Sequence, residues 1–348
     1  MAEPLDDYRN KRDFAATPEP APGPEDGPAP GNRFVVQEHH ARRLHWDFRL
    51  EHDGVLVSWA VPKGVPPDPG ANHLAVRTED HPLSYLGFEG EIPKGNYGAG
   101  VVTVWDSGTY ECEKFGPDEV MAVLHGRRVE GRYVMFRTKD DQWMIHRMDP
   151  PQDPTREPMP EWLAPMLATP GDLPDGDAEF GFEVDWDGLR TFVSGVGGTV
   201  RVRDVDGENV GERFPELARL GRALGSREVI LDGELVALGE DGRPDRERLD
   251  RRLDGARADT TPLTLMVYDL LYLDGHLVVD RPYQYRRAAL EGLELRGFHW
   301  QTPANHVGDG AEFLGVVTDR GLAGVVAKRL SSPYRPGERS PDWIKVKA

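Results

Sequence analysis

Residues 34–50 read FVVQEHHARRLHWDFRL, and this stretch carries more structural information than any other part of the chain. From His45 onward polar and apolar residues alternate, so that His45, Asp47 and Arg49 are separated by bulky apolar residues. Successive side chains of an extended strand point to opposite faces, so these three polar residues should share one face of a β-strand. The alternation therefore predicts a strand whose other face packs against a core.

The polar face of this strand has the composition of a metal site. Because strand residues two apart lie about 6–7 Å from each other, His45 and Asp47 can reach one ion, and His39 on the preceding turn can complete the set. Two imidazoles and a carboxylate suit manganese, iron or zinc better than calcium. Arg49 can grip two phosphate oxygens at once, so the pattern indicates phosphoester hydrolysis. A solvated sheet face and a non-haem iron oxygenase are alternatives for the same residues.

The overall charge argues against a broad nucleic-acid-binding surface, because 60 acidic side chains outnumber 42 basic ones and give a net charge of −18. Since phosphates bind through cations, DNA contact would have to use local clusters such as Arg42, Arg43 and Arg49 or Arg127, Arg128 and Arg132. The single cysteine, Cys112, excludes an intramolecular disulfide. With no apolar signal segment and no apolar run of about 20 residues, we expect a cytoplasmic protein without a membrane partner.

The first part of the chain divides into an arm and a β-rich domain. Residues 1–32 include a stretch dominated by proline and glycine, which predicts a flexible N-terminal arm. Residues 33–148 contain short alternating runs punctuated by glycine, which predict a mostly β domain built as a small barrel or curled sheet. One short helix is expected over residues 115–126.

The second part begins after a proline-rich linker at residues 149–162. Residues 163–348 mix strand-like runs with helical segments over residues 213–225 and 280–295. This interleaving, with several hairpin-like joins, favours an α+β fold over a parallel sheet.

The first domain resembles the 3′-phosphoesterase domain of bacterial ligase D, the multifunctional enzyme of non-homologous end joining. The matching segments span nearly all of residues 8–147 and read YRNKRDFAATPEP, FVVQEHHARRLHWDFRLEHDGVLVSWAVPKG, RTEDHPLSYLGFEGEIPKGNYGAGVVTVWDSGTYE and GRYVMFRT. The resemblance implies that His39, His45 and Asp47 bind manganese or another divalent transition metal.

The same resemblance assigns further roles in this domain. Arg49 would hold the scissile phosphate, and His81 and Tyr85 would complete the phosphate pocket. His81 would stabilise developing charge or assist the leaving group as a general acid. Within the arm segment 8–19, the residues that would fold back onto the site are Arg12, Asp13 and Glu19.

The function that this family implies is the repair of DNA 3′ ends. Its members trim a 3′-terminal ribonucleoside from a primer strand and then remove the remaining 3′-phosphate, which leaves a 3′-hydroxyl. The implied substrate is therefore a primer–template DNA end, with the protein on the nucleoid when bound to DNA. Ku, a ligase or a primase–polymerase are the implied partners.

The second domain is similar to the nucleotidyltransferase domain of ATP-dependent DNA ligases, with its ATP-grasp-like antiparallel sheets and helices. Matching pieces include FEVDWDGLR, ILDGELVAL, VYDLLYLDG, GVVAKRLSSPY and WIKVK. In those ligases a lysine of a Lys-x-Asp-Gly motif carries AMP, and this chain has Asp185 at that position. A carboxylate cannot form the lysyl phosphoramidate. There is also no lysine between Lys139 and Lys328.

Other residues of the ligase pattern are retained, namely Asp187, Gly188, Arg190, Glu234, Lys328, Lys345 and Lys347. We interpret them as inherited scaffold, which makes ATP binding doubtful; residual nucleotide binding is the alternative interpretation. The chain also ends after WIKVK, so we expect it to lack the oligonucleotide-binding domain that completes such ligases.

The sequence thus favours a metal-dependent DNA 3′-end phosphoesterase of double-strand break repair, joined to an inactive ligase-like domain. Two alternatives remain. An active ATP-dependent ligase would form a covalent AMP adduct, and a non-catalytic end-joining scaffold would only bind DNA ends or repair partners.

Overall fold

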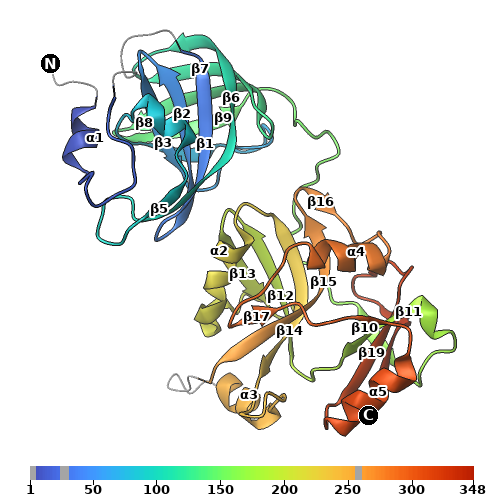
Figure 1. Cartoon of the computed structure of the whole chain (residues 1–348). Coiled ribbons are helices and arrows are strands. Elements are labelled where there is room, and N and C mark those ends of the chain that lie inside the picture. The colour runs from blue at the N-terminus through green and yellow to red at the C-terminus, as the bar shows by residue number, and fades with distance from the viewer. Residues whose placement is uncertain (1–4, 24–30, 255–260) are drawn as a thin grey trace. The chain divides into compact units, whose positions relative to one another are not determined.

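The chain forms two compact units in the computed structural model, Met1–Arg156 and Glu157–Ala348 (Figure 1). The structure describes residues 5–23, 31–254 and 261–348. Residues 1–4 and 24–30 of the predicted flexible arm therefore lie outside the described residues. Within the described ranges, no helix combines the length and the apolar character that a membrane crossing requires.

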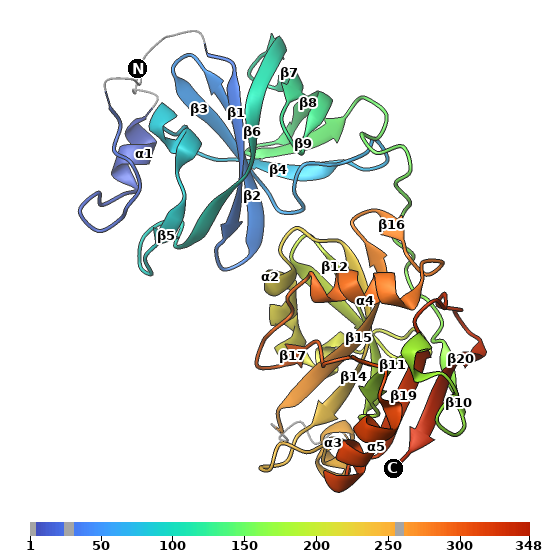
Figure 2. The same ribbon diagram turned by 45° about the vertical axis from the view of Figure 1, so that its right-hand side comes forward.

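The first unit is a closed antiparallel β-barrel, as the sequence predicted (Figure 2). The strands follow the order β1-β2-β3-β4-β9-β8-β7-β6, and pairing between β1 and β6 closes the ring, while the short β5 extends from β6. Their bounds are β1 Arg33–His40, β2 Leu44–His52, β3 Val55–Val61, β4 His73–Arg77, β5 Gly90–Ile92, β6 Gly100–Phe115, β7 Glu119–His125, β8 Glu130–Lys139 and β9 Gln142–Arg147.

Alternation builds the barrel core. Along β2 the side chains of Trp46, Phe48 and Leu50 are almost fully buried, as the sequence pattern predicted. They pack with aromatic and aliphatic residues from the other strands in one continuous cluster. The short helix α1 (Asp6–Asn10) adds the fully buried Tyr8 to this cluster, and the 3₁₀ turn η1 (Leu83–Gly87) adds Tyr85. The arm is thereby anchored on the barrel.

The helix predicted over residues 115–126 is wrong, because β6 ends at Phe115 and β7 covers Glu119–His125. In β7 the side chains of Val120, Ala122 and Leu124 are buried in turn, which is the period of two that a strand requires. The apolar residues between them are half-buried on the other face, so the run looked continuously apolar in the sequence.

The second unit is an α+β domain built on two sheets. One sheet has the order β10-β20-β19-β11-β18 and the other has the order β13-β12-β14-β15-β16, with β17 paired to β15. The bounds are β10 Leu167–Pro170, β11 Phe180–Val184, β12 Leu189–Val196, β13 Thr199–Arg203, β14 Val229–Ala237, β15 Leu263–Leu273, β16 His276–Leu277, β17 Trp300–Gln301, β18 His306–Val307, β19 Gly324–Arg329 and β20 Arg339–Lys347.

The helices of this unit are short and cover the sheets. The segment predicted as one helix over residues 213–225 consists of two 3₁₀ turns, η3 Gly211–Arg213 and η4 Pro215–Arg219, followed by α2 Leu220–Leu224. The helix predicted over residues 280–295 is present as α4 Tyr283–Glu291. The remaining elements are η2 Asp177–Glu179, α3 Arg246–Leu253 and α5 Gly310–Asp319.

Candidate metal centre and ligase-like pocket

The β1–β2 hairpin assembles a cluster of metal-ligand side chains. His39 on β1 lies directly opposite His45 on β2 in the strand register, and Gln37 lies opposite Asp47. His39 is therefore a strand residue and not a turn residue, which corrects the expectation from the sequence. Because alternate residues share a face, this register places both histidines and Asp47 on one side of the hairpin.

One ligand atom from each of His39, His45 and Asp47 lies within 4.8 Å of the others. His39 Nδ1 is 3.3 Å from Asp47 Oδ2, and His45 Nε2 is 3.7 Å from Asp47 Oδ1. Among the described residues this is the one such group of three or more His, Cys, Asp or Glu side chains. Nitrogen, nitrogen and carboxylate oxygen form a donor set that fits a divalent transition metal.

Backbone carbonyls fix the orientation of both imidazoles. His39 Nε2 is 2.8 Å from the carbonyl oxygen of Gly98, and His45 Nδ1 is 3.0 Å from that of Arg43. A carbonyl can only accept, so each of these ring nitrogens carries the proton. With an ion bound, His39 Nδ1 and His45 Nε2 would present their lone pairs to it, which is the arrangement usual for metal-binding histidines. Without an ion, His39 Nδ1 lies 3.3 Å from Asp47 Oδ2 and can hydrogen-bond to it.

Arg49 lies beside this centre and is almost fully buried. Its guanidinium donates to Gln37 Oε1 at 2.8 Å and to Ser58 Oγ at 2.9 Å, and its Nη2 is 3.1 Å from Asp47 Oδ2. Burial alone would raise the pKa of the Asp47 carboxyl. The Arg49 charge and the contact with His39 outweigh that effect, so the pKa lies below its ordinary value. Asp47 is therefore ionised and available as a ligand at neutral pH.

His81 lies between two guanidinium groups. Its Nδ1 is 2.9 Å from both the carbonyl oxygen of Glu79 and Arg49 Nη1, and its Nε2 is 3.2 Å from Arg12 Nη2. Burial, Arg49 and Arg12 hold its pKa well below the ordinary value. The ring is thus neutral at neutral pH. A proton on Nδ1 satisfies the Glu79 carbonyl and leaves Nε2 to accept from Arg12, but Arg49 Nη1 then faces Nδ1 without forming a hydrogen bond to it. Acid catalysis by His81 would require proton uptake against both charges.

The arm packs against the residues around His81 through polar contacts. Arg12 Nε donates to Glu19 at 2.7 Å, and Arg12 Nη1 donates to Glu79 at 2.9 Å. The hydroxyl of Tyr85 donates to Glu19 at 3.0 Å. Asp13 differs, because it is exposed and its carboxylate accepts from the backbone N–H of Ala15 in its own turn. The structure thus brings Arg12, Glu19 and Tyr85 to the pocket, but places Asp13 in a local turn.

Sequence reasoning missed four positions that support the centre, namely Gln37, Ser58, Glu79 and Gly98. Gln37 could have been found, because it precedes His39 by two residues and so shares its face of β1. Ser58 accepts from Arg49 on the neighbouring strand, and the Gly98 carbonyl contacts His39 from a distant loop. A single sequence does not reveal which distant residues make such contacts.

In the second unit, the ligase-pattern residues line two cavities of about 230 Å³ each. One is lined by Asp185, Arg190, Glu234, Lys328 and Lys345, and the other by Asp185, Asp187 and Gly188. Lys347 is exposed at the end of β20.

The cations of the first cavity are already paired with carboxylates of the chain. Lys345 Nζ is 2.7 Å from Asp185 Oδ2, and Lys328 Nζ is 2.6 Å from Glu183 Oε2. Arg190 forms a bidentate pair with Asp232, at 3.0 and 2.6 Å. A phosphate group entering the cavity would have to displace these internal anions.

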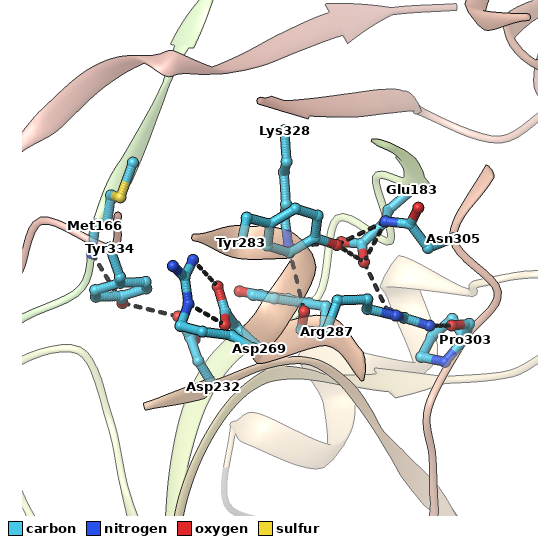
Figure 3. Close-up of polar contacts among 12 residues, drawn as sticks. Met166, Glu183, Asp232, Asp269, Tyr283, Arg287, Pro303, Asn305, Lys328 and Tyr334 are labelled. Carbon is cyan, nitrogen blue, oxygen red and sulfur yellow. Dashed lines mark hydrogen bonds and ion pairs between the residues drawn. The ribbon is translucent and has the colours of Figure 1, made fainter. Parts of the chain in front are cut away.

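Figure 3 shows the polar network around Glu183. Glu183 Oε1 accepts from the Tyr283 hydroxyl at 2.6 Å and from Arg287 at 2.8 Å, while Asn305 donates to the Tyr283 oxygen at 2.7 Å. All of these groups except Asn305 are buried. The Lys328 ammonium lies over the rings of Tyr268 and Trp343, at 4.2 and 4.3 Å from their centroids.

Comparisons with known proteins match both units. Residues 37–137 match the DNA ligase D 3′-phosphoesterase domain, and residues 165–347 match the ATP-dependent DNA ligase domain. The multifunctional non-homologous end joining protein LigD of Mycobacterium bovis is 45% identical over 100% of this chain and 46% of its own length. The LigD of Pseudomonas aeruginosa is 37% identical over 99% of this chain and 47% of its own length.

The chain therefore spans about half the length of these curated relatives. Among solved structures, mycobacterial DNA ligase D complexed with ATP and MES is 37% identical, with a TM-score of 0.49 over 54% of this chain and 60% of that one.

Proposed function

The chain is a LigD-type protein, in which a 3′-phosphoesterase domain is followed by an ATP-dependent DNA ligase domain, and we propose that its first unit hydrolyses phosphoesters at DNA 3′ ends. The observation that carries this proposal is the cluster of His39, His45 and Asp47 within 4.8 Å, with the buried guanidinium of Arg49 against it. A divalent-ion donor set and a phosphate-binding cation are the two components that such a reaction needs.

His39, His45 and Asp47 would hold the ion, which we take to be manganese, with other divalent transition metals as alternatives. When bound, the ion would supply Lewis-acid polarisation of a phosphoryl oxygen. Arg49 would bind the same phosphate, because its planar fork can exchange the Asp47 contact for two phosphate oxygens. Gln37 and Ser58 hold that fork in place.

The pocket beyond Arg49 supports binding of the rest of the phosphate. Arg12 and Arg49 flank the neutral His81, so two positive charges face the position of an anion. His81 can donate only through Nδ1, and that proton now lies against the Glu79 carbonyl. We therefore propose that His81 helps to position the Arg12 guanidinium for the phosphate, and that it acts on developing charge only when its Nδ1 proton is released from the Glu79 carbonyl. Tyr85 and Glu19 position Arg12.

The proposed substrates are primer–template ends that carry a 3′-phosphate or a 3′-terminal ribonucleoside, processed during non-homologous end joining. This step would leave a 3′-hydroxyl for a polymerase or ligase. Ku, a ligase and a primase–polymerase are the proposed partners, since the relatives are named as multifunctional end-joining proteins.

The second unit is proposed to be a ligase-like domain that does not carry AMP. Asp185 stands where the nucleophilic lysine is expected, and its carboxylate pairs with Lys345. The retained Lys328 is likewise paired with Glu183. The rival function, an active ATP-dependent ligase, rests on family membership and predicts an AMP adduct on this chain.

The decisive assay is release of phosphate from a primer–template with a 3′-phosphate in the presence of manganese. We expect the wild type to release phosphate, and His45→Ala and Asp47→Ala to lose turnover. The matched control is His125→Ala, because His125 lies on β7 in an exposed pair with Glu111, away from the centre. Inactive wild type with every divalent metal tried would end the proposal, and full activity of either ligand variant would refute the assigned ligands.

A further inference from the structure

The rim of the metal centre contains cations and an aromatic ring that the hydrolytic chemistry does not use. Two segments form this rim, the β1–β2 turn at residues 41–43 and the loop at residues 93–98 that precedes β6. We propose that this rim binds the DNA strand that ends in the scissile phosphate, with Arg42 and Arg43 on backbone phosphates and Tyr97 stacked on a base. This inference rests on the proposed function, because it identifies how that site would select a polynucleotide.

The turn at residues 41–43 lies beside the metal centre because two of the proposed metal ligands flank it and because its backbone contacts one of them. His39 and His45 flank it, and the carbonyl of Arg43 accepts the proton that orients His45. The side chains of Arg42 and Arg43 are exposed. A phosphodiester strand that entered the centre from this side would pass these two guanidinium groups.

Within the described part of the first unit, two turns carry adjacent exposed arginines without an ion pair, this turn and the one with Arg127 and Arg128, but only this turn flanks the metal centre. Among the described residues, neither Arg42 nor Arg43 has a carboxylate within ion-pair distance. Most exposed or half-exposed arginines of the same unit do have one, as in Arg9–Asp6, Arg33–Glu51, Arg77–Asp80, Arg132–Glu113 and Arg137–Asp118. In a chain with a net charge of −18, two unpaired cations beside a phosphate-binding centre favour a polyanionic ligand.

Tyr97 supplies the second component of strand recognition. Half of its surface is exposed, although it lies next to Gly98, whose carbonyl orients His39. The Arg12 guanidinium is 5.6 Å from its ring centroid, and that same guanidinium contacts His81. Tyr97 is therefore linked to the metal side through its neighbour Gly98 and to the phosphate side through Arg12. Exposed aromatic rings interleaved with cations are the usual elements of single-strand binding, because every base has a face that stacks.

The test measures binding of a fluorescent primer–template with a 3′-phosphate to the full chain, by anisotropy over a range of salt concentrations. We expect Arg42→Ala/Arg43→Ala to raise the Kd about tenfold and to lower the slope of log Kd against log salt by about 1–2, as for loss of two phosphate contacts. Tyr97→Ala should weaken binding by roughly tenfold, which lies within the range for one lost base stack. Arg42→Lys/Arg43→Lys and Tyr97→Phe should bind almost like the wild type.

Two matched controls separate this rim from general charge and hydrophobicity. Arg127→Ala/Arg128→Ala removes another adjacent, exposed arginine pair of the same barrel, from the β7–β8 turn. Tyr285→Ala removes a tyrosine that is also half exposed and also has an arginine near its ring, in the second unit. Both controls should bind like the wild type. Thermal unfolding of each variant confirms that the fold is intact.

Phosphate release from the same DNA separates the two proposals. If the wild type turns over, the rim variants should raise KM and leave kcat close to wild type, since they do not touch the reacting phosphate. Wild-type turnover with unchanged Kd and KM in the rim variants would overturn the strand-binding rim but keep the phosphoesterase. DNA binding that depends on the rim, without any turnover, would keep the rim but refute the phosphoesterase. Equal losses in the two controls, or no DNA binding by the wild type, would also overturn the rim.

Discussion

Replacing Arg49 by methionine should destabilise the metal-free barrel far more than the metal-bound barrel. Arg49 is 2% exposed and is the counter-ion of Asp47, which is 7% exposed. Methionine keeps much of the apolar volume but removes the guanidinium charge from the buried Asp47 carboxylate, which keeps only its contacts with His39 and His45. Removing one partner of a buried ion pair costs about 3–5 kcal/mol. For a unit of this size, about 2–4 °C of melting temperature corresponds to each kcal/mol, so we expect a drop of about 10 °C.

Manganese should recover much of that loss, because an ion bound by His39, His45 and Asp47 would itself compensate the carboxylate. The measurement is differential scanning calorimetry at pH 7.5, with chelator and with excess manganese. Asp47 is ionised at this pH, and the stability that its lowered pKa contributes is lost only as the pH falls below about 4. An equal drop with and without metal, or a drop of less than about 2 °C in chelator, would refute the reasoning.

Arg137→Met is the matched control for this experiment. Arg137 lies on β8 of the same barrel, and its side chain and that of its partner Asp118 are 45% and 70% exposed. Exposed pairs contribute about 0–1 kcal/mol, so this variant should melt within about 3 °C of the wild type in either condition.

Three further predictions concern other parts of the chain. With ATP and magnesium, intact-mass measurement should show no AMP adduct, because Asp185 cannot form the lysyl bond; a mass increase of one AMP would contradict this. The barrel should lose stability as the pH falls below about 6.5. His81 binds a proton in the unfolded chain but stays neutral in the folded barrel, where its pKa is lowered. The measurement is urea unfolding as a function of pH, and the same pH dependence in a His81→Gln variant would disprove this origin. Tyr283→Phe should destabilise the second unit by about 1–3 kcal/mol, since it removes a buried hydrogen-bond donor to Glu183. Phosphate release by the first unit should stay at the wild-type rate. A changed rate would show that the first unit depends on the second for its activity.

The sequence was most informative where alternation and chemistry coincided. In β2 the period of two correctly predicted both the buried apolar face and the shared polar face of His45, Asp47 and Arg49. The same rule applied to β1 would have added Gln37 to the site and placed His39 on a strand. The error at residues 115–126 arose because β7 is apolar on both faces, so its period was hidden.

Contacts between distant segments were beyond a single sequence. The Glu79 carboxylate pairs with Arg12 of the arm, which is 67 residues away in the chain, while the Glu79 carbonyl contacts His81. The sequence around His81 gives no sign of the ion pair between Glu79 and Arg12. The resemblance to ligase D pointed to Arg12 and Glu19, but it also pointed to Asp13, which the structure places in a local turn. In the second unit, the substitution at Asp185 was evident from the sequence, whereas its ion pair with Lys345 depends on the approach of β20 to the end of β11.

The most direct test of the metal centre is the number of manganese ions bound per chain, measured by equilibrium dialysis against the chelator-stripped protein. The wild type should bind one ion tightly, and the single variants His39→Ala, His45→Ala and Asp47→Ala should each lose it while remaining folded. If the wild type takes up no manganese, zinc or iron, or if all three variants retain the ion with wild-type affinity, the two histidines and the carboxylate do not form a metal centre.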